Sequence, residues 1–288
     1  MKRIYCDGVF DLFHNGHLLH LQKIVHYFNE PIYLLVGVIS DNVSKTYKRQ
    51  PIFNEQQRLK TLDACIYVNE AFITDTLIID EEYMTKYNID FVIHAFNDTS
   101  DKSKQNDFFE IPMKLNKFIE IDYNANISTT QIIKENNLYS RSNYIDIDVS
   151  VSNINHIINV LQIPDNSEIL EIGCLFPNYF SNHSYIGTNI DMSFVAKQIN
   201  KFGKIVLQFD VIKQQIFKTK YFDYTLISFH NEDAHILKII EETERMTKYG
   251  IYFININKES IEETFFINKG FHILNQNSLD FYDAYKII

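Results

Sequence analysis

The sequence predicts an α/β protein made of two doubly wound domains, each an open parallel sheet with helices on both faces. The chain has 288 residues, enough for about two domains of common size. Strand-like apolar segments alternate with helix-like segments in both halves, as in parallel sheets. Periodicity is weak at residues 141–151, so we expect a linker there, between domains at 1–140 and 152–288.

The first half opens with a strand, a helix and a second strand. The helix starts near His17, because Leu18, Leu21 and Ile24 recur at the spacing of one helical face. The segment 32–40 is a continuous apolar run, typical of a parallel strand buried on both faces. The other strands are expected at residues 2–5, 66–73, 89–96 and 118–123, and the other helices at 54–65, 80–88 and from 127 onward.

The second half repeats the alternation. One long helix is expected over residues 234–249, and two short apolar runs near the C-terminus, 271–276 and 283–288, could pair as a hairpin. The remaining strands are expected at 167–174, 183–190, 204–211, 222–229 and 249–256.

Composition excludes several classes of protein. Lys and Arg total 27 against 37 Asp and Glu, a net charge of −10 that disfavours binding to nucleic acid or an anionic membrane. No apolar run approaches the length of a membrane span, and no signal peptide is evident, so we expect a cytoplasmic protein. The three cysteines, Cys6, Cys65 and Cys174, are too far apart to suggest a zinc site or a disulfide framework.

The segment Tyr5–Leu21 carries the strongest functional signal. A strand leads through a loop containing Gly8 into the sequence His14-Asn15-Gly16-His17, at the start of a helix. Histidines three residues apart can face one ligand, glycine lets the backbone approach it, and a helix N-terminus favours anions. This geometry suits a triphosphate, although an isolated histidine pair is more often structural or solvated.

The first half resembles the HxGH nucleotidyltransferase superfamily, and within it the cytidylyltransferases that act on phosphocholine, phosphoethanolamine and glycerol phosphate. The resemblance covers about residues 1–140 and implies a Rossmann-like nucleotidyltransferase fold. It rests on ordered motifs: YCDGVFDLFHNGH, YLLVGVISD, the Lys48 neighbourhood, NEQQR, YVNEAF, KYNIDFVIHAFND and ISTTQII.

The resemblance implies that a phosphate oxygen of an alcohol phosphate attacks the α-phosphorus of CTP and pyrophosphate leaves, a step of phospholipid biosynthesis. His14 and His17 would contact the α- and β-phosphates, and Lys48 would bridge the incoming phosphate and the α-phosphate. Mg²⁺ is expected on the triphosphate, with no protein side chain assigned as its ligand. The implied nucleotide-binding residues are Gly8, Val9, Phe10, Asp11, Gly16, Arg58, His94, Ile127, Ser128 and Thr129.

Four of these residues have simpler alternative interpretations. Lys48 lies in a cationic cluster that could be a solvated loop. Ser128 and Thr129 could cap a helix, and Arg58 could pair with Glu55 on its own helix.

Two motifs depart from the family. The arginine of the family's RTEGIST signature is replaced by Tyr123, so Lys134, Arg141 or a partner subunit would have to supply that charge. The turn after the fourth strand is shifted by one residue, which weakens any role for Asp98. Because the family is commonly dimeric, we expect a homodimer.

Phosphoethanolamine is slightly favoured as the substrate, with phosphocholine next and another aminoalkyl phosphate or phosphonate left open. A quaternary ammonium prefers aromatic faces, yet the chain has no Trp, and Leu77 stands where phosphocholine enzymes tend to carry one. The long basic amphipathic helix of lipid-regulated phosphocholine enzymes is also absent, so membrane docking is not expected.

The second half resembles class I S-adenosylmethionine-dependent methyltransferases. Its possible cofactor-binding residues are Glu171, Gly173, Asn189 and Asp210. Residues 174–177 replace the usual further glycines, and Asn189 stands where an acidic residue should grip the ribose, so we expect weak S-adenosylmethionine binding or none. A scaffold or dimerisation module accounts for the second half as well as an active enzyme does.

Other functions stay open at this point. A bifunctional protein could also N-methylate the phosphoethanolamine moiety. A non-catalytic nucleotide-binding protein would explain Tyr123 and the loss of the usual glycines at residues 174–177. ATP could replace CTP, because related adenylyltransferases share the HxGH motif.

Overall fold

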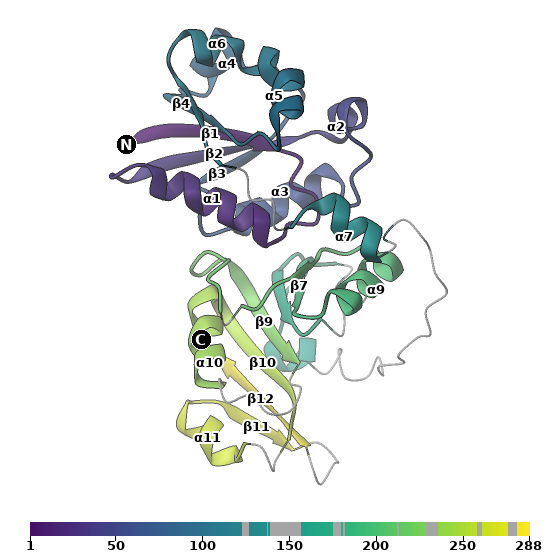
Figure 1. The fold of residues 1–288 in the computed structure, drawn as a ribbon. Helices are drawn as coiled ribbons and strands as arrows, with labels where there is room; N and C mark the ends of the chain where they lie inside the picture. Colours follow the sequence, from purple (N-terminus) through teal and green to yellow (C-terminus); the bar gives the residue numbers. More distant parts are fainter. Residues whose placement is uncertain are drawn as a thin grey trace. The chain divides into compact units, whose positions relative to one another are not determined.

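A computed structural model of the chain separates into two compact units, Met1–Glu135 and Asn136–Ile288 (Figure 1). The predicted linker 141–151 lies outside the described residues, as does Tyr123. The structure describes residues 1–122, 127–136, 138, 157–174, 180, 182–211, 213–228, 236–257, 261–275 and 281–288.

The first unit is a five-stranded parallel sheet in the order β3-β2-β1-β4-β5. Its strands are β1 (Lys2–Gly8), β2 (Ile32–Ile39), β3 (Glu70–Thr74), β4 (Phe91–His94) and β5 (Phe118–Glu120). Its helices are α1 (Asn15–Tyr27), α2 (Asp41–Tyr47), α3 (Glu55–Ala64), α4 (Glu81–Lys86), α5 (Thr99–Gln105), α6 (Glu110–Lys114) and α7 (Thr129–Asn136), with a 3₁₀ turn at Asn106–Phe109.

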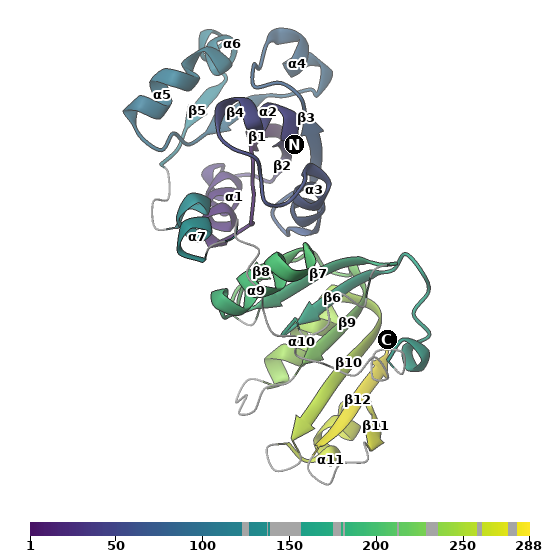
Figure 2. The same ribbon diagram turned by 90° about the vertical axis from the view of Figure 1, so that its right-hand side faces the viewer.

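Helices cover both faces of this sheet, with α1 and α3 on one side and α4, α5 and α6 on the other (Figures 1 and 2). The predicted doubly wound fold is therefore confirmed. The central strands are buried as expected, since Leu34, Leu35 and Val36 of β2 are fully inaccessible. Because the chain builds the sheet from β1 through β2 to β3 and then crosses to β4, the switch point lies between β1 and β4.

The sequence prediction missed three short helices, α2, α5 and α6. They are only five to seven residues long, too short to show an apolar period. Local capping defines two of them: the Ser40 side chain accepts from the Val43 amide at 3.4 Å, and Asp98 accepts from the Asp101 amide at 2.8 Å. β3 also starts later than predicted, because the chain first turns after α3.

The second unit is a seven-stranded sheet in the order β11-β12-β10-β9-β6-β7-β8. Its strands are β6 (Glu168–Ile172), β7 (Ser184–Asn189), β8 (Val206–Gln208), β9 (Phe222–Ser228), β10 (Thr247–Asn257), β11 (His272–Asn275) and β12 (Phe281–Ile287). Its helices include α9 (Met192–Phe202), α10 (Ile236–Met246) and α11 (Glu263–Asn268).

The predicted C-terminal hairpin is confirmed, since β11 and β12 pair antiparallel and β12 also pairs antiparallel with β10. The predicted helix 234–249 is too long at its C-terminal end. There, Thr247 starts β10, and its buried hydroxyl lies 2.6 Å from that of Thr225 on β9. None of the helices that the structure describes combines the length and hydropathy needed to cross a bilayer.

Candidate active site

The HxGH motif forms the N-terminal cap of α1. His14 is the cap residue, and its Nδ1 accepts a hydrogen bond from the Gly16 amide at 3.1 Å. The His17 Nδ1 accepts from the His14 amide at 3.4 Å, which completes a capping box built from two imidazoles. The two rings stack with centroids 3.9 Å apart. Both histidines therefore lie at the positive end of the helix dipole.

Both imidazoles are neutral near neutral pH. Burial lowers the pKa of His14 to about 4. Burial also lowers the pKa of His17 well below its usual value, and the neighbouring His14 adds to the effect. Since each Nδ1 accepts an amide proton, each neutral ring carries its own proton on Nε2. The motif therefore supplies two uncharged N–H donors.

Gly16 permits the close contact between this cap and the segment that leads into α7. A Cβ at Gly16 would lie 2.9 Å from the His14 Cε1 atom and 3.1 Å from the Ile127 carbonyl oxygen. Any larger residue would push one of the two segments away. The absence of a side chain at this position is thus a packing requirement.

The N-terminus of α7 meets that of α1 through Thr129. The Thr129 hydroxyl lies 3.1 Å from the His14 Nε2 atom and donates to the Asp11 carbonyl at 3.2 Å. Ser128 Oγ accepts from the Gln131 amide at 3.2 Å, so Ser128 caps α7. The N-termini of α1 and α7 thus converge at this point, where the positive ends of both helix dipoles favour an anion.

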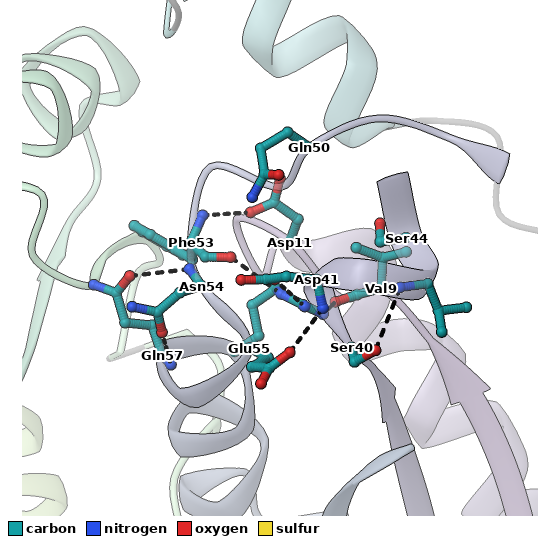
Figure 3. A network of polar contacts seen from close by, with 12 residues as sticks. Val9, Asp11, Ser40, Asp41, Ser44, Gln50, Phe53, Asn54, Glu55 and Gln57 are labelled. Atoms are coloured by element: carbon teal, nitrogen blue, oxygen red, sulfur yellow. Dashed lines mark hydrogen bonds and ion pairs between the residues drawn. The ribbon is translucent and has the colours of Figure 1, made fainter. Parts of the chain in front are cut away.

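The Asp11 carboxylate holds the segment that follows Lys48. It accepts from the backbone amide of Phe53 at 3.0 Å (Figure 3). It also accepts from the Ile52 amide at 2.9 Å and from the Arg49 guanidinium at 2.9 Å. Asp11 is 2% exposed. The structure therefore places its carboxylate in an internal clamp and does not direct it at a nucleotide.

Arg58 also joins separate segments in the interior of the first unit. Its side chain is fully buried and donates to the carbonyls of Phe53 at 3.1 Å and Val9 at 2.6 Å. A third donor reaches the Asp41 carboxylate at 2.7 Å, in the network of Figure 3. The structure thus gives Arg58 neither the predicted contact with phosphate nor the alternative pairing with Glu55, whose carboxylate instead accepts from the Asp41 amide.

Titratable side chains gather at the switch point, where β1 and β4 end. Burial raises the pKa of Asp7 to about 7, while hydrogen bonding from Tyr5 and the charge of Lys48 oppose the shift. The His94 Nδ1 atom lies 3.9 Å from Asp7, and burial lowers the pKa of His94 to about 3. Burial lowers the pKa of Lys48 as well, against the attraction of Asp101 and Asp7. A carboxyl, a neutral imidazole and an ammonium thus lie near one another at this edge of the sheet.

Sequence reasoning missed Asp7 and Asp101. A signal for Asp7 was present, because an acidic residue at the end of a buried strand, just before Gly8, points to the carboxyl edge of the sheet. Asp101 had no such signal. It lies on the short helix α5, and its proximity to Lys48 depends on how that helix packs.

The remaining predicted residues of the first unit have clear places. Gly8 ends β1, and Phe10 is buried with its ring 5.3 Å from that of His17. Lys134 lies in the last turn of α7, at the opposite end from Thr129. Asp98 caps α5. Arg141 lies outside the described residues.

In the second unit the predicted cofactor residues bond to their own neighbours. Glu171 is buried and accepts from the Tyr185 hydroxyl at 2.8 Å. Asn189 donates to the Gly173 carbonyl at 2.8 Å, and its oxygen accepts from the amide two residues later at 2.9 Å. Asp210 pairs with Lys213 at 3.0 Å. Residues 175–179 lie outside the described part.

Comparison with known proteins identifies the first unit. Residues 5–135 match the family model described as cytidylyltransferase-like. The N-terminal half of the chain carries a cytidylyltransferase-like domain. The family resemblance expected from the motifs is thereby confirmed.

Curated relatives match the same region. Choline-phosphate cytidylyltransferase 2 of Arabidopsis thaliana is 34% identical over 134 residues, which cover 46% of this chain and 43% of the relative. Ethanolamine-phosphate cytidylyltransferase of Dictyostelium discoideum is 34% identical over 131 residues, covering 46% and 35%. The chain thus spans less than half the length of these relatives. Among solved structures, a TehB-like SAM-dependent methyltransferase from Corynebacterium glutamicum is 15% identical with a TM-score of 0.39, covering 54% of this chain and 95% of the other.

The buried Arg58–Asp41 pair should dominate the stability of the cytidylyltransferase-like domain. Arg58→Met leaves the Asp41 charge and two carbonyls without their donors, and breaking such a pair costs about 3–5 kcal/mol. We expect a lower urea midpoint by circular dichroism. Lys114→Met, which breaks the exposed pair with Glu110, should leave the midpoint nearly unchanged. Equal effects of the two variants would contradict the assignment.

Proposed function

We propose that this protein transfers CMP from CTP to the phosphate of a small alcohol phosphate, releasing pyrophosphate and a CDP-alcohol. The convergence of two helix N-termini on the His14–His17 pair carries the proposal, because the positive ends of two helix dipoles and two imidazole Nε2–H groups lie together there, which suits a polyphosphate. The relatives that act on choline phosphate and ethanolamine phosphate support the same reaction class.

The reaction requires positioning and hydrogen-bond donation without a covalent intermediate. An oxygen of the alcohol phosphate bonds to the α-phosphorus of CTP, while the bond from that phosphorus to the bridging oxygen breaks and pyrophosphate leaves. His14 and His17 donate Nε2–H to phosphate oxygens, whose charge grows in the transition state. Lys48 holds the incoming phosphate beside the α-phosphate.

Mg²⁺ would reach the site with the triphosphate. Within the described part of the chain, no group of three or more His, Cys, Asp or Glu side chains is arranged to hold a metal ion. The Asp11 carboxylate is occupied by two amides and a guanidinium. The cation would therefore be held mainly by phosphate oxygens, and when bound it supplies charge neutralisation.

The Asp7 carboxyl supports an aminoalkyl phosphate as the acceptor, with phosphoethanolamine preferred over phosphocholine. Such a substrate carries a phosphate and an ammonium group a few atoms apart, which matches the proximity of Lys48 to Asp7. A primary ammonium donates hydrogen bonds to a carboxylate, whereas a quaternary one relies on aromatic faces. The Tyr5 ring beside Asp7 is buried against Tyr83 and belongs to the core.

For the second unit we propose that S-adenosylmethionine does not bind at micromolar concentrations. The Asn189 amide is used to join the Gly173 carbonyl to the start of the next helix. Glu171 is occupied by Tyr185, whose hydroxyl also lies 3.2 Å from Cys174. A cofactor would have to replace these bonds, which favours an auxiliary role over a bifunctional methyltransferase.

The first test is pyrophosphate release with CTP or ATP against phosphoethanolamine, phosphocholine and glycerol phosphate. We expect the highest kcat/KM with CTP and phosphoethanolamine. His17→Ala should lower kcat by about a hundredfold, since a transition-state donor is lost. His26→Ala, an exposed histidine on the same helix, is the control. A wild-type protein inactive with every pair, or a His17 variant with unchanged turnover, would refute the proposal.

The second test is the pH dependence of acceptor use. Because the raised pKa of Asp7 leaves it partly protonated near pH 7, kcat/KM for phosphoethanolamine should rise as the pH increases through about 7. Dividing by kcat/KM for glycerol phosphate removes the titration that both phosphates share. Asp7→Asn should lower this ratio by about tenfold and flatten its profile. If this ratio changes neither with pH nor in the Asp7→Asn variant, Asp7 takes no part in acceptor recognition.

The third test addresses the second unit. Calorimetric titration of the full chain with S-adenosylmethionine should give no dissociation constant below about 100 μM, which corresponds to less than about 5.5 kcal/mol of binding free energy. CTP titrated into the same sample is the positive control for folded protein. A low-micromolar constant for S-adenosylmethionine would instead favour the bifunctional alternative.

A further inference from the structure

A directed chain of hydrogen bonds passes through the His14 ring. The Gly16 amide can only donate, so the His14 Nδ1 atom is the acceptor and the proton of the neutral ring is on Nε2. That Nε2–H faces Thr129 Oγ1 at 3.1 Å. The Thr129 hydroxyl in turn donates to the Asp11 carbonyl at 3.2 Å, which leaves its oxygen lone pairs to accept from His14. Every group in the chain has one consistent direction.

We propose that Thr129 is a positioning residue for His14, which holds the imidazole in its orientation and keeps its proton on Nε2. This inference deepens the proposed function, since it assigns to Thr129 a role other than the phosphate contact that the family resemblance implies. The ring is fixed at three places: Nδ1 by Gly16, Nε2 by Thr129, and one face by the stacked His17 ring. An incoming phosphate oxygen then meets a ring whose proton is already on Nε2, and it shares this proton with Thr129 in a three-centre hydrogen bond.

Capping of α7 does not account for the Thr129 hydroxyl. Ser128 performs that task, because its Oγ atom accepts from the Gln131 amide. Thr130, the next residue, is exposed. Of these three adjacent hydroxyl groups, Thr129 is the one that reaches across to the HxGH loop.

The same contact connects the segments that carry the proposed chemistry. The Asp11 carbonyl receives the Thr129 hydroxyl, while its carboxylate holds the amides of Ile52 and Phe53 after Lys48. His14, Lys48 and the start of α7 are thus tied to one buried residue. A change at Thr129 should affect turnover more than nucleotide affinity, since the α7 amides and Ser128 stay in place.

The experiment compares Thr129→Val, which keeps the shape and removes the hydroxyl, with Thr129→Ser, which keeps the hydroxyl. Thr130→Val is the matched control. Protein labelled with ¹⁵N in its histidines reports the protonation of each ring nitrogen, and His14→Gln assigns the His14 signals. We expect the wild type and Thr129→Ser to show an unprotonated Nδ1 and a slowly exchanging Nε2–H. Thr129→Val should lose that slow exchange.

The kinetic measurement completes the test. Thr129→Val should lower kcat by about tenfold with the KM for CTP changed by less than about twofold, and Thr129→Ser should recover most of the turnover. A His14 protonated on Nδ1 in the wild type overturns the proposal, even if Thr129→Val does not fold. Unchanged exchange and turnover in a folded Thr129→Val also overturn it. A wild type without transferase activity refutes the proposed function alone, because the spectra still decide the role of Thr129.

Discussion

The buried carboxylate of Asp11 is the interaction on which the arrangement of the first unit depends. Taking a charge out of water costs several kcal/mol unless hydrogen bonds replace its hydration. Two backbone amides and a guanidinium do so here, and all three come from residues 49–53. That requirement forces the loop after Lys48 to lie against the loop before α1. Arg58 reinforces the arrangement by binding the Val9 and Phe53 carbonyls.

The same desolvation sets the chemical character of the site. It makes both histidines of the HxGH motif neutral, so they act as hydrogen-bond donors and add no positive charge. Positive electrostatic potential then comes from the two helix N-termini and from Lys48. At the switch point, burial brings the pKa of Asp7 into the physiological range, where a nearby ammonium group would favour its ionised form. The two anions and one cation of the proposed reaction would thus meet a site with few formal charges.

The second unit belongs to the same fold class but uses the ends of its strands differently. In the first unit, the carboxyl edge brings together a carboxyl, an ammonium and neutral imidazoles. In the second, Glu171, Tyr185 and Cys174 bond to one another, and Asn189 bonds to backbone on either side. A ligand that binds these groups must first break the hydrogen bonds between them, so the exchange brings little net binding free energy. A doubly wound sheet therefore does not by itself imply a bound cofactor.

The sequence by itself determined the alternation of strands and helices, the two-sheet α/β class and the C-terminal hairpin, because apolar periodicity and turn residues are local properties. It also determined the family of the first half, since the HxGH, NEQQR and ISTT motifs occur in order. The tertiary structure alone decided what Arg58, Asp11 and Thr129 contact. Apart from Phe53, which lies five residues before Arg58, their partners lie 17 to 118 residues away in the sequence, and no local pattern encodes which carbonyl or carboxylate a buried donor will meet. It likewise decided the pKa of Asp7, which depends on how completely other segments exclude water from the end of β1.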